Sequence, residues 1–140
     1  MTRKSTDVAT VMDAYFALRS GDLSKLDVLA ESFTFIHPLA QIHGRDAYLT
    51  MHEELAEAFP HAELTVDELL VGENMAMWEW RLRGTHTGRW RGVEPTNRRF
   101  EISGMSKTIL SGEKVVSSRA YFDSGALLRQ LGLDWPLDDV

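Results

Sequence analysis

The hydrophobic pattern of this chain changes its period once, and that change restricts the possible fold more than any other feature. Up to about residue 60, apolar side chains recur at helical spacing, whereas from about 62 to 123 they alternate with polar ones as in strands. Glycine-containing turns at 72–74 and 111–113 are short enough for hairpins. Helices segregated from a mostly antiparallel sheet define the α+β class.

Start and stop signals give the approximate bounds of each element. Ser5, Thr6 and Asp7 offer caps for a first helix that begins at Val8 and ends at Gly21. The other predicted helices are a short one at 22–29, a third at 46–59 capped by Asp46, and a closing one at 124–132. Strands are predicted at 32–37, 62–71, 75–84, 98–110 and 114–123. The stretch 86–97 is the one long irregular segment, and loops of that length are usually functional.

The composition limits the number of domains and the kinds of partner. A chain of 140 residues suits one domain, with a core at about 8–132 and a tail at 133–140. Its net charge of −6 argues against nucleic-acid binding, and no cysteine is available for a disulfide or a nucleophile. No segment has the apolar length of a signal peptide or a membrane helix, so we expect a cytoplasmic protein without a membrane partner.

A curved sheet closed by three helices makes a cone whose wide end is hard to fill with side chains. Gly104 is a candidate for a bend in one strand. The concave face is expected to be aromatic, with residues of the strands facing residues of the first helix: Phe35, Trp78, Trp80 and Tyr121 against Tyr15 and Phe16. Such surfaces are typical of pockets for small organic molecules, although the same rings could simply fill the core.

Three segments carry a resemblance to a known family. They are Gly44-Arg45-Asp46 with Ala58-Phe59-Pro60; the loop from Gly84-Thr85-His86-Thr87-Gly88 to Pro95-Thr96-Asn97-Arg98; and Tyr121-Phe122-Asp123 with the 127–132 stretch LLRQLG. Together they resemble the SnoaL-like polyketide cyclases and ester cyclases of the nuclear transport factor two-like superfamily. The resemblance implies a cone-shaped, cystatin-like α+β partial barrel without a cofactor, forming a homodimer through the convex face of the sheet.

The resemblance also implies a chemistry. Members of the family include cyclases that close a ring by intramolecular aldol condensation, with an aspartate at the end of the last strand as general acid/base, and Asp123 matches that position. The sequence departs from the family at Arg119, where a tryptophan is usual, and at Asn97, where the loop usually has glycine. Asparagine tolerates the left-handed conformation, so the second change is conservative.

Strand alternation places Arg119, Tyr121 and Asp123 on one side of the last strand, which we expect to face the cone. A carboxylate there would have its pKa raised by burial and could remove a proton next to a carbonyl. Alternatively, Asp123 caps the helix that follows, and both roles can coexist. Arg119 is expected to pair either with an acidic ligand or with an acid such as Glu79.

The remaining polar candidates are histidines and arginines. His37 is expected to line the pocket, His52 to line it or to be a core residue, and His86 to shape its loop through backbone hydrogen bonds. No spacing of a metal ligand set is present, so no metal is expected. Residues 83–99 hold five arginines, which indicate either a solvated loop or an anionic ligand at the pocket mouth.

The sequence leaves several functions open. The first is an acid/base cyclase or isomerase acting next to a carbonyl group of a small molecule. Others are a non-catalytic carrier of a small apolar or acidic ligand, an enzyme like the epoxide hydrolases, and a dimerisation module with a filled cone. The direction of Asp123 and Arg119 and the volume of the cone are the observations that separate them.

Overall fold

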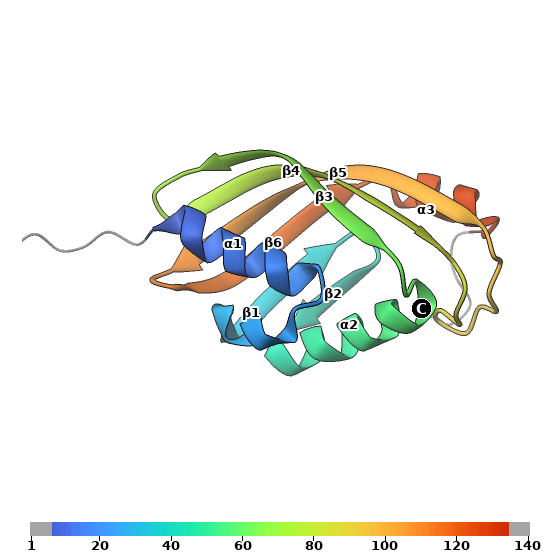
Figure 1. Ribbon diagram of the computed structural model, residues 1–140, viewed down its shortest axis with the longest axis horizontal. Helices are drawn as coiled ribbons and strands as arrows, with labels where there is room; N and C mark the ends of the chain where they lie inside the picture. The colour runs from blue at the N-terminus through green and yellow to red at the C-terminus, as the bar shows by residue number, and fades with distance from the viewer. Residues whose placement is uncertain (1–6, 135–140) are drawn as a thin grey trace, which may run out of the picture.

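A computed structural model describes residues 7–134, and in it a strongly curved sheet arches over two helices (Figure 1). The helical elements are α1 (Val8–Arg19), the 3-10 helix η1 (Leu23–Val28), α2 (Arg45–Ala58) and α3 (Ser124–Leu131). The strands are β1 (Leu29–His37), β2 (Ala40–His43), β3 (Glu63–Val71), β4 (Met75–Thr85), β5 (Arg99–Ser111) and β6 (Lys114–Phe122). The predicted α+β class is confirmed.

The six strands form one open sheet in the order β2-β1-β6-β5-β4-β3. All neighbours are antiparallel except β1 and β6, which run parallel. The long strands β4, β5 and β6 curve so that their concave face covers α1 at one end and α2 at the other, while α3 follows β6 at the far end (Figure 1). The predicted curved, mostly antiparallel sheet closed by the N-terminal helices is therefore confirmed.

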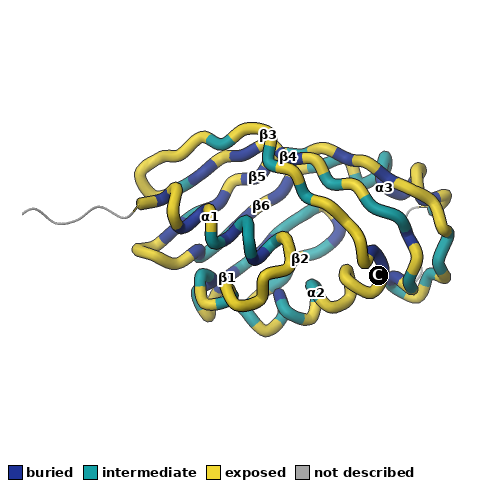
Figure 2. Tube along the Cα trace, in the orientation of Figure 1, coloured by how far each residue is buried: buried dark blue, intermediate teal, exposed yellow. Residues whose placement is uncertain are grey.

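Alternation along the strands separates a buried face from an exposed one (Figure 2). On β4, Ala76, Trp78 and Trp80 are buried, while the residues between them are exposed. The indole N–H of Trp78 donates to Thr108 Oγ1 at 3.0 Å, and that of Trp80 donates to Ser106 Oγ at 2.9 Å. Because these hydroxyls come from the neighbouring strand β5, they satisfy both buried donors and hold the rings in place.

The helix starts differ in detail from the prediction. Asp7 caps α1, as predicted, by accepting a hydrogen bond from Thr10 N. Helix α2 starts one residue early because Gly44, at φ 92°, serves as its N-cap and Asp46 lies inside the first turn. Strand β1 begins at Leu29 rather than at residue 32, because η1 is a short 3-10 helix that ends at Val28. Ser5, Thr6 and the predicted tail from 135 onward lie outside the described residues.

A β-bulge in β6 overturns the predicted orientation of that strand. Leu110 of β5 pairs with Val115, but the preceding residue Ile109 pairs with Ser117, so Val116 is an extra residue. A one-residue insertion of this kind moves every later side chain to the opposite face of the sheet. Val115 is buried before the bulge, and after it the inward residues are Ser118, Ala120 and Phe122.

Gly104 of β5 permits a close contact on the inner face. A Cβ at this position would lie 2.4 Å from an atom of the Trp80 ring and 2.6 Å from the carbonyl oxygen of Tyr121. Any side chain would therefore displace Trp80 or the strand backbone. Gly104 was predicted as a place where the strand bends. The contact shows that its lack of a side chain also leaves room for the Trp80 ring against the sheet.

The segment 86–98 between β4 and β5 packs against the end of α2. The backbone N–H groups of Thr87 and Gly88 both donate to Ala58 O at 3.1 Å. A Cβ on Gly88 would lie 1.8 Å from Glu57 O, so only glycine fits here. Asn97 has φ 59°, which confirms its left-handed conformation. None of the helices in the part of the chain that the structure describes has the length and apolar character needed to span a membrane.

Candidate functional site

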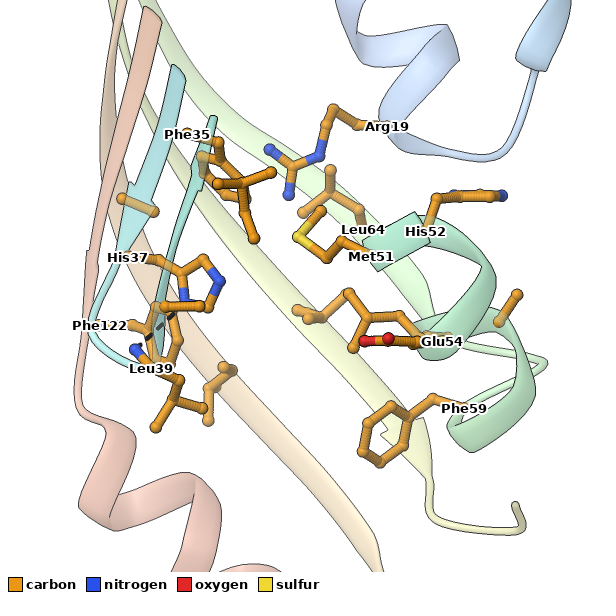
Figure 3. A pocket seen from close by; sticks show the side chains of 18 of the residues that line it. Arg19, Phe35, His37, Leu39, Met51, His52, Glu54, Phe59, Leu64 and Phe122 are labelled. Atoms are coloured by element: carbon orange, nitrogen blue, oxygen red, sulfur yellow. Dashed lines mark hydrogen bonds between the residues drawn. The ribbon is translucent and has the colours of Figure 1, made fainter. Parts of the chain in front are cut away.

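A cavity of about 960 Å³ lies between the concave face of the sheet, α2, the end of α1 and the loop 86–98. Aromatic and aliphatic side chains form most of its wall (Figure 3). The aromatic lining residues are Phe35, Tyr48, Phe59, Trp78, Trp80, Trp90, Phe100 and Phe122. The rings of the sheet therefore do not fill the cone, and the space that remains is large enough for a small organic molecule.

Five of the residues predicted to line a pocket do so: Phe35, His37, His52, Trp78 and Trp80. Tyr15 and Phe16 do not. Tyr15 is fully buried under α1, where its ring packs against Phe33 and Trp78, and Phe16 packs edge-on against Trp78 at 4.9 Å. These two rings support the base of the cavity from behind.

The prediction that Arg119 and Tyr121 face the cone is wrong. The β6 bulge turns both residues to the outer face of the sheet, where Tyr121 is 59% exposed and Arg119 is exposed. Phe122 takes the inward position and lines the cavity instead. The hypothesis of an acidic ligand held by Arg119 therefore loses its geometric basis.

Asp123 also lies outside the cavity wall. Its carboxylate accepts a hydrogen bond from Ala126 N at 2.9 Å as the N-cap of α3, which is the alternative role given to it above. The side chain is 69% exposed and lies 3.8 Å from the Arg129 guanidinium. A carboxylate in this position is solvated and does not point into the cone, so we assign it a capping role and no catalytic step.

Arg19, at the last position of α1, brings a cation into the cavity. Its guanidinium projects into the space beside Phe35, with Cζ 4.7 Å from the ring centre, and Nη1 donates to Tyr15 Oη at 3.2 Å (Figure 3). Among residues 7–134 it forms no ion pair with a carboxylate. A guanidinium stays protonated in proteins, so Arg19 is a permanent charge in an apolar wall.

Arg19 is not among the residues predicted to line the pocket, although the sequence carries a signal for it. Val8, Met12 and Tyr15 are buried on one face of α1, and position 19 follows Tyr15 by four residues on that same face. A pattern of apolar residues alone does not include a polar side chain at the end of the helix. An arginine that continues a buried face is a candidate for a cavity residue.

His37, at the end of β1, is a neutral donor in the cavity wall. Its Nδ1 accepts a hydrogen bond from Leu39 N at 3.2 Å, so in the neutral ring the proton is on Nε2. Burial, together with the positive charges of Arg19 and Arg91, lowers the pKa of His37 to about 4. The ring lies tilted against Phe35 and stacks on Phe122, at 5.1 and 6.1 Å between centres.

Two residues of α2 add polar groups to the opposite wall. Burial raises the pKa of Tyr48 to about 12, so its phenol stays protonated at neutral pH and can donate a hydrogen bond. The Glu54 carboxylate points into the cavity, whereas the His52 ring turns away from its centre and stacks on Tyr48 at 6.4 Å (Figure 3). Glu63 also lines the cavity but is paired with Arg83 at 2.9 Å.

His86 has the structural role predicted for it. The ring is fully buried beside Phe59 and Trp90, and its Nδ1 accepts a hydrogen bond from Thr96 N at 3.2 Å across the loop. Burial lowers the pKa of His86. Among residues 7–134 no three His, Asp or Glu side chains are grouped as a metal site would require. The expectation that the protein binds no metal stays a prediction.

Comparison with known protein families identifies the family of this chain. The family model described as SnoaL-like polyketide cyclase matches residues 6–131. This chain belongs to the SnoaL-like polyketide cyclase family. The matched range includes every helix and strand described above, together with all the cavity residues. The comparison with curated proteins gave no match.

Solved structures support the same fold. A protein assigned as a SnoaL-like polyketide cyclase in Jannaschia sp. CCS1 is 17% identical, with a TM-score of 0.80 over 96% of this chain and 99% of that one. IdmH of Streptomyces antibioticus, assigned as a polyketide cyclase, is 23% identical, with a TM-score of 0.73 over 89% and 98%. A protein from Catenulispora acidiphila with a ketosteroid isomerase-like fold is 16% identical, with a TM-score of 0.74 over 93% and 96%. At these identities the likeness concerns the fold alone.

Proposed function

We propose that this protein is a cyclase or isomerase that binds a small, largely apolar molecule with an enolisable carbonyl group and stabilises its enolate. The observation that carries the proposal is the Arg19 guanidinium, which projects into an aromatic cavity without a carboxylate partner among residues 7–134. A partly buried charge without a counter-ion in an apolar wall is costly, and it becomes favourable when negative charge develops beside it. Membership of the SnoaL-like polyketide cyclase family supports the reaction class.

The polar groups of the cavity suit the two halves of a proton transfer. Glu54 takes the proton from the carbon next to the carbonyl, and the electron pair of that C–H bond moves to the carbonyl oxygen. Arg19 and the Nε2–H of His37 donate hydrogen bonds to the resulting enolate oxygen. A neutral imidazole is a suitable donor here because it does not lose its proton to the enolate during the reaction.

The enolate then has two possible fates, each balanced in protons and electrons. In a cyclase its carbon attacks a second carbonyl of the same molecule, and protonated Glu54 returns the proton to the new alkoxide. In an isomerase protonated Glu54 returns the proton to a different carbon of the conjugated system. Neither path changes the oxidation state of the substrate, so neither requires a redox cofactor.

The exchange of α-protons in 1-tetralone, a bicyclic aromatic ketone, tests this assignment. In D₂O the wild-type protein should accelerate the loss of the α-CH₂ proton signal, and Glu54→Gln should reduce that rate by roughly 10²-fold or more, the contribution of a general base. Asp123→Asn is the matched control, because asparagine retains the α3 cap and the residue lies outside the cavity.

Two results would contradict the proposal. Binding of 1-tetralone without any acceleration of exchange would support a non-catalytic carrier instead. Loss of exchange in Asp123→Asn, with Glu54→Gln unaffected, would return the base role to the aspartate. An epoxide hydrolase-like mechanism has no support in this geometry, since Arg119 and Asp123 both lie outside the cavity.

We also propose that two copies of the chain associate through the outer face of the sheet. Apolar side chains are exposed there on four neighbouring strands: Leu70, Met77, Met105 and Tyr121, at 72%, 43%, 47% and 59% exposure. Leu70 pairs with Met77 across β3 and β4, and Met105 pairs with Tyr121 across β5 and β6. Exposed apolar groups on adjacent strands favour a self-complementary interface.

A further inference from the structure

A second guanidinium lines the cavity, and the proposed reaction does not use it. Arg91 lies in the loop 86–98 with φ 49°, in the left-handed region that few arginines occupy. Its Nη2 donates to Leu39 O at 3.1 Å, and its Cζ lies 5.5 Å from the centre of the Trp90 ring. The strained backbone, the aromatic contact and the hydrogen bond together turn this side chain inward.

The hydrogen-bonding capacity of Arg91 is largely unused. Its Nη1 is buried and has no partner, one of two such side-chain atoms among residues 7–134. A buried donor without an acceptor costs free energy, and more so when it carries charge. No carboxylate of residues 7–134 forms an ion pair with Arg91. An anionic group of a ligand in the cavity would supply the missing acceptors.

Two other arginines of the segment 83–99 form ion pairs on the surface. Arg83 is paired with Glu63 at 2.9 Å and Arg89 with Glu94 at 3.5 Å, and both guanidinium side chains are 62% exposed. Of the two interpretations of the arginine-rich segment, a solvated surface therefore applies to Arg83 and Arg89. The other interpretation, an anionic ligand at the pocket mouth, applies to Arg91.

Arg91 and Arg19 approach the cavity from different elements. Arg19 ends α1, whereas Arg91 enters from the loop between β4 and β5, and the pKa of His37 is lowered by both charges. Leu39 joins the two parts of the wall: its carbonyl accepts from Arg91, and its N–H donates to His37. The cavity therefore has two separate cationic positions. Arg19, together with His37, donates to the enolate oxygen, whereas the proposed reaction does not use the guanidinium of Arg91.

We propose that Arg91 forms a second anion subsite and that the substrate is an oxo acid, with its carboxylate at Arg91 and its enolisable carbonyl at Arg19 and His37. This inference rests on the proposed function. It narrows the substrate class to molecules with an acidic group separated from the reacting ketone by an apolar or aromatic body. Charge-assisted hydrogen bonds at both ends would fix which carbon faces Glu54.

A different partner for Arg91 exists within the protein. Burial lowers the pKa of Arg91, and the charge of the Glu54 carboxylate offsets part of that effect. The competing role for Arg91 is this electrostatic contact with Glu54 alone, without a contact to a ligand. The two roles differ in one property: only an anion subsite distinguishes ligands with a carboxylate from ligands without one.

A matched pair of probes tests the subsite. 7-Hydroxycoumarin and 7-hydroxycoumarin-3-carboxylate share one apolar ring system and one acidic phenol, but only the second carries a carboxylate at the opposite end. At a pH where both phenols are ionised, we expect wild-type protein to bind the carboxylated probe about tenfold more tightly. Arg91→Met should abolish that preference without changing the affinity for 7-hydroxycoumarin.

Three further variants make the outcome decisive. Arg89→Met, in the same loop but paired with Glu94, should retain the full preference. Arg91→Lys keeps the charge and should retain part of it, whereas Arg19→Met should weaken both probes by the same factor. Equal affinity of the wild-type protein for the two probes, or equal weakening of both by Arg91→Met, would overturn the subsite while leaving the proposed function intact. Failure of the wild-type protein to bind either probe would overturn the proposed function itself.

Discussion

The surrounding structure strongly affects the protonation of His37. Burial, together with the charges of Arg19 and Arg91, lowers its pKa from 6.5 to about 4. The folded state therefore binds this proton more weakly than the unfolded state does. Between about pH 6.5 and pH 4 the unfolded chain takes up the proton first, so the contribution of His37 to stability is complete above this window and falls as the pH decreases.

Replacing His37 isolates this effect. His37→Gln should make the free energy of unfolding less dependent on pH, and the wild type should lose up to about 3 kcal/mol more than the variant between pH 7 and pH 4. Chemical denaturation at a series of pH values measures the difference, with His43→Gln, an exposed histidine, as the control. Parallel pH profiles for His37→Gln and the wild type would contradict the assigned pKa.

At the scale of single residues, part of the candidate site could be predicted from the sequence. Phe35, His37, His52, Trp78 and Trp80 were found because alternation or helical spacing assigns them to inward faces. Arg91 appeared only as one of five arginines, because nothing in a loop sequence tells which side chain turns inward. The fixed orientation of Arg91 depends on a backbone conformation and on Leu39, which is 52 residues away in the sequence.

At the scale of helices and strands, the N-terminus of helix α3 is capped by the side chain of Asp123. Asp123 accepts the N–H of Ala126, so Asp123→Ala should destabilise the protein by about 1 kcal/mol, whereas Asp123→Asn should be nearly neutral. Thermal unfolding of the two variants measures this, and binding of 7-hydroxycoumarin should be unchanged in both because the residue lies outside the cavity wall. A large loss of probe affinity in Asp123→Asn would show that the carboxylate reaches the ligand.

The order of the elements could be predicted from the sequence, but the orientation of β6 could not. Helical and alternating periods, with glycines at the turns, were sufficient for the succession of helices and strands. The bulge at Val116 gives no such signal, and uninterrupted alternation from Val115 assigns the inner face to Arg119 instead of Ala120. One extra residue was therefore enough to make the predicted orientation of Arg119, Tyr121 and Asp123 wrong.

At the scale of the whole molecule, the outer face of the sheet predicts a dimer. Sedimentation of the wild-type protein should give twice the mass of the chain, and Tyr121→Glu should shift it toward the monomer, because it places a charge among the exposed apolar side chains. Arg83→Glu, outside the apolar group, is the control for added negative charge. A monomeric wild-type protein at all concentrations tested would contradict the interface.

The curvature of the sheet is what leaves a hollow beside the core. Tyr15, Phe33, Trp78 and Leu128 are nearly inaccessible to solvent, yet the space between β4, β5, α2 and the loop stays open. That a cone would remain open could be predicted from the element order, whereas its charge pattern required the packed structure. Arg19 and Arg91 bring two positive charges to the lining of this hollow.

The pKa of 7-hydroxycoumarin bound in this cavity tests the central claim most directly, since its phenolate resembles an enolate and absorbs light differently from the phenol. Burial in an apolar pocket alone would raise the pKa of the phenol, whereas Arg19 and His37 should lower it. We predict a bound pKa at least about one unit below that of the free probe in the wild-type protein. In Arg19→Met the pKa should rise above the free value. A raised pKa in the wild-type protein, or the same pKa in both proteins, would contradict an oxyanion-stabilising pocket.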